Sequence, residues 1–362
     1  MNTSLQDIRT AFQNQRERGL RAREAAEALG MGEGAAMAAH CGASGGPLRA
    51  LPLKPDWLGL LQSLQVCGPL MALTRNDAVV HEKTGIYQKV SANGHVGLAL
   101  GEDIDLRLFF NQWHAGFAVF EALKSQPGEE APPSLQFFDR HGAAVHKIFV
   151  REQTDLAAWR QVVARFEEPA RETVFEPPEA VRAPAPVAQD VDAEAFAAAW
   201  EAMTDTHQFF GLLKRFGLER QQGFRLVEGR YAHRVVNAAV RELLVEAAFD
   251  GTPVMVFVGS PGCIQIHTGP VKRVEPMEVH GKTWLNVLDP GFNLHLREDL
   301  IQEVWVVEKP TSDGVVTSVE AFDAHGGLMA MFFGARKPGQ AELDAWRQIV
   351  AHLPAAGQPV AA

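Results

Sequence analysis

The chain is poor in cysteine and tyrosine and has no long apolar run, and each scarcity excludes a class of protein or site. Its three cysteines, Cys41, Cys67 and Cys263, stand far apart and form no CxxC pair, so the sequence favours neither a disulfide framework nor a structural zinc site. No segment approaches the roughly eighteen apolar residues of a membrane span, and the N-terminus lacks the apolar core of a secretory signal. We therefore expect a cytoplasmic protein without stable membrane insertion.

Positive charge is also scarce. The formal net charge is -10 over 362 residues, which argues against nucleic acid or an anionic membrane surface as the partner, although it allows one local basic pocket. Hydrophobic residues make up 46% of the chain, so there is ample core for two domains. The only tyrosines are Tyr87 and Tyr231, which leaves few candidates for tyrosinate ligation of a metal. Small molecules are the expected partners.

The first part of the chain is predicted to be mixed α and β. Residues 4–40 have the pattern of three short helices, similar to a helix-turn-helix. Five arginines against four acidic residues leave the first thirty residues at about +1, too little for the phosphate contacts of a DNA-binding domain. We expect a packing cap instead. A helix near 57–65, β segments between 70 and 150, and a helix at 155–166 follow.

The second part begins after residues 167–190, which are rich in Pro, Ala and charge without periodicity, as is typical of a semi-extended linker. Helices are predicted at about 192–203, 205–216 and 234–246. Eight strands follow, and a last helix is expected at 340–352.

The two parts repeat one another. A turn of sequence Phe-Asp-x-His-Gly begins at Phe138 and again at Phe322, with a glycine at the same distance before each. Both parts then end in nearly the same sequence, Ala-Trp-Arg-Gln-Val-Val at 158–163 and Ala-Trp-Arg-Gln-Ile-Val at 345–350. This equal spacing indicates a duplicated α+β unit.

We therefore expect an N-terminal repeat over 1–166, a linker over 167–190 and a C-terminal repeat over 191–354. The predicted fold class is α+β with a tandem duplication, in which each half has a large antiparallel β-sheet and flanking helices. A cleft between the halves, where a ligand can be held from both sides, is the expected binding place.

One stretch, residues 203–216, combines a helix start with a potential ligand. Asp205 or Thr206 can cap the helix, and His207 falls in its first turn. An imidazole there can ligate a metal through the ring nitrogen that the backbone does not engage. A capping or solvent-facing histidine is the alternative. Large apolar residues recur at helical spacing behind it and predict one broad apolar face, namely Phe209, Phe210, Leu212, Leu213 and Phe216.

Together with the repeat, four segments resemble the haemin-degrading factors of the HemS/HmuS type: GEDIDLRLFFNQW, TDTHQFFGLLKRFGLER, VWVVEKPTSDG and MFFGARKPG. These factors are cytoplasmic haem-binding proteins of bacterial haem-uptake systems, and the resemblance covers essentially the whole chain. It implies haem b as the ligand or substrate, placed in the cleft between the halves.

The resemblance also implies roles for individual residues. It places the axial ligand of the haem iron on His207, flanked by the aromatic rings of Phe209 and Phe210, and the distal arginine on Arg107. Where family members often carry a tyrosine, this chain has Phe333, which can still stack on the porphyrin edge. For the haem propionates the family pattern points to three cations, Arg220, Lys309 and Arg336.

Some of these assignments have alternatives. Arg107 could instead form a salt bridge with Asp103 or Asp105. His81 and His267 occupy corresponding places in the two repeats, where each strand meets Thr-Gly. They could be secondary ligands or could stabilise the turn, and we favour the turn-stabilising role.

Two functions are compatible with the resemblance. In the first, the protein sequesters imported haem and passes it to a haem-degrading enzyme, with a haem oxygenase and an inner-membrane haem importer as the expected partners. In the second, it degrades haem itself and releases iron, with Arg107 stabilising negative charge on the distal side. No flavin or nicotinamide fingerprint is visible, so this activity would depend on an external electron donor. We favour the first function.

Overall fold

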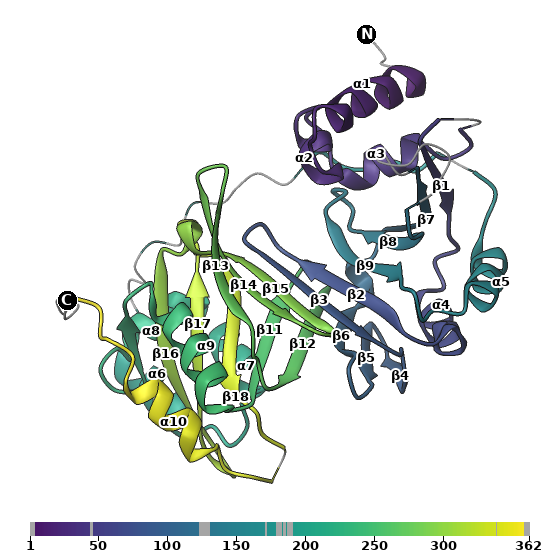
Figure 1. The fold of residues 1–362 in the computed structure, drawn as a ribbon. Coiled ribbons are helices and arrows are strands. Elements are labelled where there is room, and N and C mark those ends of the chain that lie inside the picture. Colours follow the sequence, from purple (N-terminus) through teal and green to yellow (C-terminus); the bar gives the residue numbers. More distant parts are fainter. Residues whose placement is uncertain are drawn as a thin grey trace. The chain divides into compact units, whose positions relative to one another are not determined.

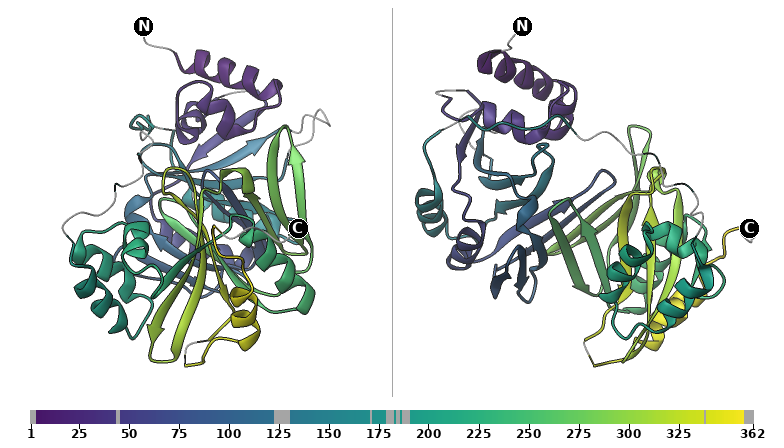
Figure 2. Two further views of the ribbon diagram at one scale, coloured as in Figure 1. Left: turned by 90° about the vertical axis from the view of Figure 1, so that its left-hand side faces the viewer. Right: turned by 180° about the vertical axis from the view of Figure 1, so that it is seen from behind.

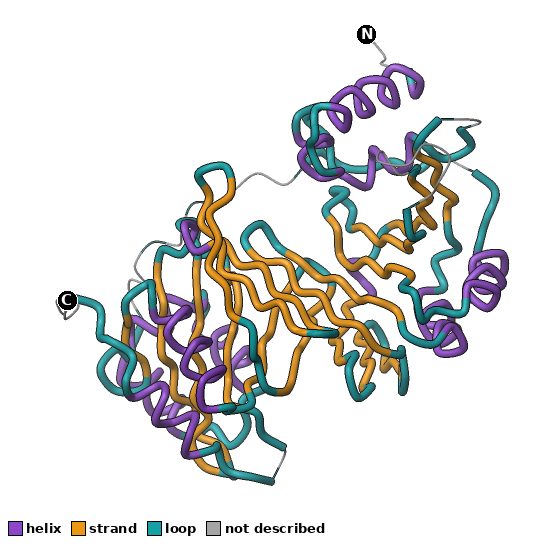
Figure 3. Tube along the Cα trace, viewed as in Figure 1, coloured by secondary structure: helices purple, strands orange, loops and turns teal. Residues whose placement is uncertain are grey.

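The computed structural model describes residues 4–43, 46–122, 131–170, 172–178, 183, 186, 191–337 and 339–357. Contacts divide the chain into two compact units (Figure 1). The first unit comprises Met1–Arg75, His81–Ala180 and Gly259–Gln265; the second comprises Asn76–Val80, Val181–Val258 and Ile266–Ala362. Each combines antiparallel strands with helices (Figure 3). The predicted α+β class and the two large antiparallel sheets are therefore confirmed.

In the first unit, six strands are hydrogen-bonded in the order β1 (Leu48–Pro52), β7 (Ala115–Glu121), β8 (Ser134–Phe138), β9 (Ala144–Val150), β2 (Leu70–Arg75) and β3 (Val79–Gly85). A second antiparallel group contains β4 (Val90–Asn93), β5 (Val96–Leu100) and β6 (Asp105–Phe109). Strand β6 ends at Phe109, where a short 3-10 helix, Phe110–Gln112, follows.

Helices cover both faces of the larger group of strands. The three predicted N-terminal helices are present and pack on one face through a cluster that includes Phe12, Met37 and Phe138: α1 (Leu5–Glu17), α2 (Ala22–Glu27) and α3 (Glu33–Ala39). The other face packs against α4 (Trp57–Ser63), continued by a 3-10 turn at Leu64–Cys67, and α5 (Leu156–Phe166). The N-terminal segment is thus a packing cap, as expected.

In the second unit, the strand order is β10 (Ala232–Val235), β16 (Glu303–Thr311), β17 (Gly314–Phe322), β18 (Leu328–Gly334), β11 (Val254–Gly259) and β12 (Cys263–Gly269). A further antiparallel group contains β13 (Val274–Val279), β14 (Lys282–Asp289) and β15 (Phe292–Arg297), which a 3-10 helix, Glu298–Leu300, follows. One face of the larger group packs against α9 (Ala239–Asp250) and α10 (Asp344–Ala351). The other packs against α6 (Ala193–Glu201), α7 (Gln208–Phe216) and α8 (Arg220–Leu226) (Figure 2).

Two predictions for this unit were incomplete. The segment expected as a helix from 234 begins with β10, and α9 starts only at Ala239. Helix α8 was not predicted, because it is short and contains Gly223. A glycine is needed there, since a Cβ at this position would come within 2.8 Å of Leu213 Cδ2 and 3.1 Å of the Phe196 ring.

The strand registers confirm the duplication. In the first unit Leu70 pairs with Val150, and in the second Val254 pairs with Gly334. The β8 and β9 hairpin has a bulge at Phe137/Phe138, and the β17 and β18 hairpin has one at Ala321/Phe322. In each repeated turn an aspartate accepts two backbone N–H groups: Asp139 from His141 and Ala143, and Asp323 from His325 and Gly327.

Part of the predicted linker, residues 171, 179–182, 184–185 and 187–190, lies outside the described residues. The described part at 172–178 packs on the first unit, where Phe175 contacts the ring of His114 at 5.2 Å between centroids and the Glu176 N–H donates to Arg140 O.

Within the described part of the chain, no helix has the length and apolar character that crossing a membrane requires.

One position where the repeats differ predicts a stability effect. Gly334 in β18 lies so close to α10 that an added Cβ would come within 2.6 Å of Trp346 Cβ. We expect Gly334→Ala to lower the free energy of unfolding by about 1–3 kcal/mol through overpacking, visible as a lower urea midpoint. Gly211 in α7 has nothing within 4 Å of the same added atom, so Gly211→Ala should be neutral or stabilising by up to ~1 kcal/mol. Equal midpoints for the two variants would contradict this account.

Candidate functional site

His207 immediately precedes α7, and its side chain is 90% exposed. Its Nδ1 lies 2.6 Å from Asp205 Oδ1, which also accepts the His207 backbone N–H at 2.8 Å. The expectation that Asp205 or Thr206 caps the helix is wrong, because α7 starts at Gln208, its N-cap residue is His207, and no described side chain caps it. The contacts with His207 lower the pKa of Asp205, with the backbone N–H of His207 as the largest cause and its ring next. The carboxylate fixes the ring with the proton on Nδ1 and leaves Nε2 exposed, as in histidines that ligate metals.

The two phenylalanines after His207 have different environments. Phe210 is 76% exposed and presents its ring at the surface. Phe209 is 3% exposed, stacks on Phe224 with 5.9 Å between ring centroids, and meets Trp200 edge-on at 4.9 Å. The expectation that Phe209 flanks a ligand beside His207 is therefore wrong: the helical period turns it into the core, and only Phe210 stays outside.

Arg220 and Lys309 are brought together by Glu320, a fully buried carboxylate on β17. Arg220 Nη2 lies 2.8 Å from Glu320 Oε1 while its Nε meets Oε2, and Lys309 Nζ lies 3.0 Å from Oε1. Both cations also lie over the Phe209 ring, Arg220 Cζ at 5.0 Å and Lys309 Nζ at 4.9 Å from its centre. We call Arg220, Lys309 and Glu320 the ion triad.

The members of the ion triad differ in access to solvent. The side chain of Lys309 is only 4% exposed, whereas that of Arg220 is 27% exposed. Burial lowers the pKa of Lys309 to about 8, although Glu320 opposes this shift. Burial also disfavours ionisation of Glu320, but the charges of Arg220 and Lys309 outweigh it and hold its pKa well below the ordinary value. Two cations against one carboxylate leave an excess of positive charge, which Arg220 presents at the surface.

An apolar platform lies beside the ion triad on the same face of the strands. Phe333 on β18 pairs with Met255 on β11, and Met331 pairs with Phe257. All four side chains are half-buried, and the rings of Phe257 and Phe333 meet edge-on at 5.0 Å. Met331 is directly opposite Glu320, and its Sδ lies 3.2 Å from Arg220 Nη2. The platform comprises Met255, Phe257, Met331 and Phe333.

Of the platform residues, only Phe333 was predicted from the sequence. The other three carry a weak signal, because each alternates along its strand with a fully buried residue. A half-buried apolar residue at every second position is also what an ordinary sheet face shows, so the pattern alone does not indicate a ligand surface.

Arg336 lies just beyond β18, near the start of α7. Its Nη1 is 3.7 Å from Asp313 Oδ2 and donates to Gln340 O at 3.2 Å. The positive charge of Arg336 contributes to the lowered pKa of Asp205, and the Ser312 N–H donates to Thr204 O at 2.9 Å. The turn between β16 and β17 thus holds together the segments that carry Arg336 and His207.

Arg107 belongs to the first unit, whereas the other predicted site residues belong to the second. It lies on β6 opposite Leu98 of β5, and its Nη1 forms an ion pair with Asp105, two residues earlier on the same strand face. This is one of the salt bridges that the sequence left open. The two side chains are 33% and 25% exposed, so the guanidinium still reaches the surface.

Comparison with known proteins identifies the family. The model of the haemin-degrading HemS.ChuX domain matches residues 30–166 and again residues 217–353. The chain belongs to this family. It is 44% identical over 305 residues to the hemin transport protein HemS of Yersinia enterocolitica, covering 83% of this chain and 85% of the relative. The hemin transport protein HmuS of Yersinia pestis is 44% identical over 307 residues, with the same coverage.

Solved structures of similar proteins match the whole HemS.ChuX-type fold. The structure of holo-PhuS, described as a heme-binding protein from Pseudomonas aeruginosa, has a TM-score of 0.88 and 44% identity, covering 97% of this chain and 99% of that one. The structure of ChuS, described as an E. coli heme oxygenase, has a TM-score of 0.84 and 38% identity, covering 96% and 99%.

The two HemS.ChuX domains of this chain differ on the face that carries the platform. The register places Lys147 of the first unit where the second has Met331. Lys147 Nζ lies 2.6 Å from Glu33 of α3, and Arg75 binds the same carboxylate at 2.7 Å. Burial disfavours ionisation of Glu33, but Lys147 and Arg75 outweigh it and lower its pKa to about 2. At the other three positions the first unit is also apolar, with Met71, Leu73 and Phe149. The two domains therefore differ on this face by the buried charge of Lys147 and its ion pairs.

His81 and His267 are core residues of these domains. Both lie within strands, β3 and β12, and are 0% and 4% exposed. Gln265 Nε2 lies 2.8 Å from His81 Nδ1, and the ring of His267 stacks on Phe292 with 3.7 Å between centroids. The expectation that they stabilise turns is wrong, because the strands continue through both positions.

Proposed function

We propose that this chain is a cytoplasmic haem-binding protein of bacterial haem utilisation, which sequesters imported haem and passes it to a haem-degrading enzyme. The observation that carries the proposal is the exposed Nε2 of His207, backed by Asp205 on Nδ1. A carboxylate on the second nitrogen fixes the tautomer of a metal-binding histidine and raises its basicity. The names of the relatives, hemin transport protein and heme-binding protein, agree with this function.

The residues of the second unit fit the chemistry of haem. Haem supplies the iron and a flat apolar macrocycle with two carboxylates, and the chain would supply the complement. His207 offers one axial nitrogen, and Phe210 and Phe333 offer apolar surface. Arg220 and Arg336 offer guanidinium groups for the propionates. Lys309 is buried against Glu320, so we assign it the role of adding positive charge beneath the site.

One axial ligand suits a protein that must release its cargo, because only one bond has to be exchanged when haem is transferred. We propose that a haem importer of the inner membrane delivers the haem and that a haem oxygenase receives it.

Titration of the purified chain with hemin tests haem binding. We expect saturable growth of the Soret band at one hemin per chain, followed by a stable spectrum when a reductant is added in the presence of catalase. An unchanged hemin spectrum at equimolar protein would reject haem binding altogether.

Haem degradation is a second candidate, favoured by the likeness to ChuS, described as a heme oxygenase. The same titration separates the two functions. Loss of the Soret band after reduction, with a defined product and carbon monoxide released despite catalase, would show that the chain degrades haem itself. Electrons would then come from an external donor.

Arg107 is proposed as the distal residue, and its replacement gives a distinct prediction. Arg107→Ala should leave hemin bound but change the absorption spectrum and the midpoint of its alkaline transition, because the guanidinium would no longer stabilise hydroxide on the distal side. Asp105→Asn is the matched control, since it removes the ion-pair partner and keeps the guanidinium. An alkaline transition that is the same in Arg107→Ala as in the wild type would refute this role.

A further inference from the structure

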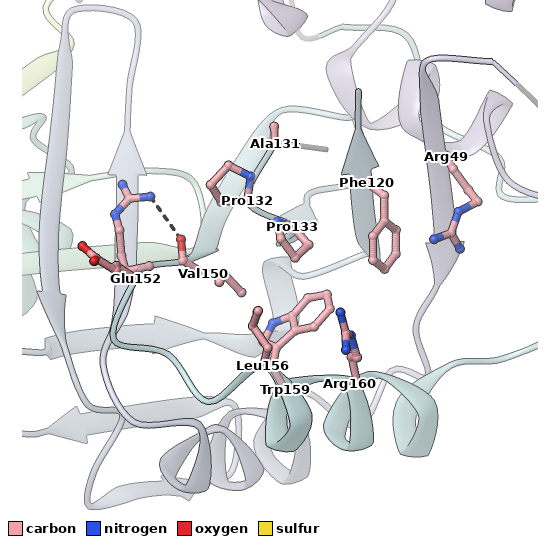
Figure 4. Close-up of a pocket in the computed structure, with 11 residues that line it drawn as sticks. Arg49, Phe120, Ala131, Pro132, Pro133, Val150, Glu152, Leu156, Trp159 and Arg160 are labelled. Carbon is pink, nitrogen blue, oxygen red and sulfur yellow. Dashed lines mark hydrogen bonds between the residues drawn. The ribbon is translucent and has the colours of Figure 1, made fainter. Parts of the chain in front are cut away.

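The first unit contains a cavity of about 600 Å³ between α5, the strands β1, β7 and β9, and the residues that precede β8 (Figure 4). It shares no residue with the candidate haem site described above. Its size falls within the range of small-molecule sites, and much of its lining is apolar, as such sites require. The apolar lining consists of Phe120, Ala131, Pro132, Pro133, Val150, Leu156 and Trp159.

The charged lining residues are mostly basic: Arg49, Arg151 and Arg160 against the single carboxylate of Glu152. Arg151 Nη1 donates to Val150 O, and Arg49 Cζ lies 4.0 Å from the centre of the Phe120 ring. In the part of the chain that the structure describes, none of the three guanidinium groups has an ion-pair partner. In a chain of net charge -10, this is a local basic site.

Trp159 carries an unpaired donor beneath the same cavity. It is 1% exposed, and its indole nitrogen has no acceptor among the described residues. A buried donor without an acceptor is unfavourable, and most such groups in proteins are paired.

The duplication explains why this donor is unpaired. Trp346, the counterpart of Trp159 in the Ala-Trp-Arg-Gln sequence, donates to Thr317 O at 3.1 Å. Trp346 can lie close against strand β18 because Gly334 of that strand has no side chain. The strand register places Val150 where the second unit has Gly334. We attribute the cavity to this valine, whose side chain holds the indole of Trp159 away from the strand carbonyls.

We propose that this cavity binds a small amphipathic carboxylate. Its apolar body would lie on Phe120 and Leu156, and its carboxylate would meet the guanidinium groups of Arg49 and Arg160. Both arginines are exposed, and in Figure 4 they lie on the Phe120 side of the cavity, opposite Glu152.

Calorimetric titration of the hemin-saturated full chain tests the proposal, with decanoate and decyltrimethylammonium as probes of equal chain length and opposite charge. We expect decanoate to bind at one site and the cation to bind at least about tenfold more weakly. Arg160→Gln should weaken decanoate binding about tenfold. Arg165→Gln, on the same helix but outside the cavity lining, should leave it unchanged.

A further variant separates the cavity from general effects on folding. Leu156 is 42% exposed at the first turn of α5, so Leu156→Trp should fill the cavity without disturbing the core and should abolish decanoate binding.

Three results would overturn the proposal: equal binding of the cation and decanoate, equal affinities for Arg160→Gln and Arg165→Gln, or decanoate binding that survives in Leu156→Trp. Binding confined to the hemin-free protein would place decanoate at the haem site and would overturn it as well.

Discussion

His207→Ala is expected to lower the affinity for hemin by more than about 100-fold, because loss of a residue that merely orients a metal ligand already costs 10–100-fold. Asp205→Asn should fall within that smaller range, since the ring keeps its place but loses the carboxylate that fixes Nδ1. The measurement is a competitive hemin titration followed at the Soret band, with the spectrum of any remaining complex recorded.

The chain offers a matched control in His325. It is exposed in the same unit, and its backbone N–H donates to the aspartate two residues earlier, Asp323, as that of His207 does to Asp205. His325→Ala should therefore bind hemin as the wild type does. If His207→Ala and His325→Ala gave the same affinity and the same spectrum, the assignment of the axial ligand would be rejected.

The fold was largely predictable because its signals are local and occur twice. The turn that begins at Phe138 returns at Phe322, and the aspartate in each copy accepts the backbone N–H groups that close the turn. Such signals lie within a few residues of one another, so they can be read along the chain. Helix α8 was missed because Gly223 is unfavourable for a helix and is needed only for packing against Leu213.

The candidate site was less predictable because its contacts are distant in sequence. His207 and Asp205 are two residues apart, so a ligand with its supporting carboxylate could be foreseen. Glu320 lies 100 positions from Arg220, and only the packing of α8 on β17 brings the two together. A glutamate in the otherwise apolar strand β17 was the available signal, because a buried charge requires a partner. The sequence could not name that partner.

The different environments of Phe209 and Phe210 show a second limit of prediction from the sequence. Spacing placed both on one broad apolar face, but a helix beside a sheet buries only part of such a face. Which of two adjacent phenylalanines meets the core depends on how α7 packs against Trp200 and Phe224. The residue left outside is the one that can contact a ligand.

Replacement of Glu320 is expected to have the largest effect on stability. Glu320→Gln keeps the shape but leaves Lys309 and Arg220 without their counter-charge, and breaking a buried ion pair on one side costs about 3–5 kcal/mol. Chemical unfolding at neutral pH should show a correspondingly lower midpoint. Glu303→Gln is the control, since Glu303 pairs with Arg225 closer to the surface, at 20% and 35% exposure, and such pairs contribute about 0–1 kcal/mol.

The pH dependence separates a charge effect from a packing effect. The pKa of Lys309 is lowered to about 8 from 10.5, so between these values the unfolded chain binds more protons than the folded chain, and the contribution of Lys309 makes the protein more stable as pH rises. Without Glu320 the folded pKa falls further, because the carboxylate no longer favours the ammonium form. The loss of stability in Glu320→Gln should therefore be largest near pH 7 and smaller near pH 10, where Lys309 is neutral when folded.

A second replacement tests whether the charge of Lys309 causes the loss of stability. Adding Lys309→Met to Glu320→Gln removes the unpaired ammonium group and should restore much of the lost stability, because buried ion pairs can often be replaced by apolar groups at little cost. If the loss in Glu320→Gln were the same at both pH values and Lys309→Met restored nothing, Glu320 would act through its contacts with Arg220 and the hydrogen bond that it accepts from Ser318. In that case Lys309 would hold no charge that needs neutralising, and its proposed electrostatic role beneath a haem propionate would fail with it.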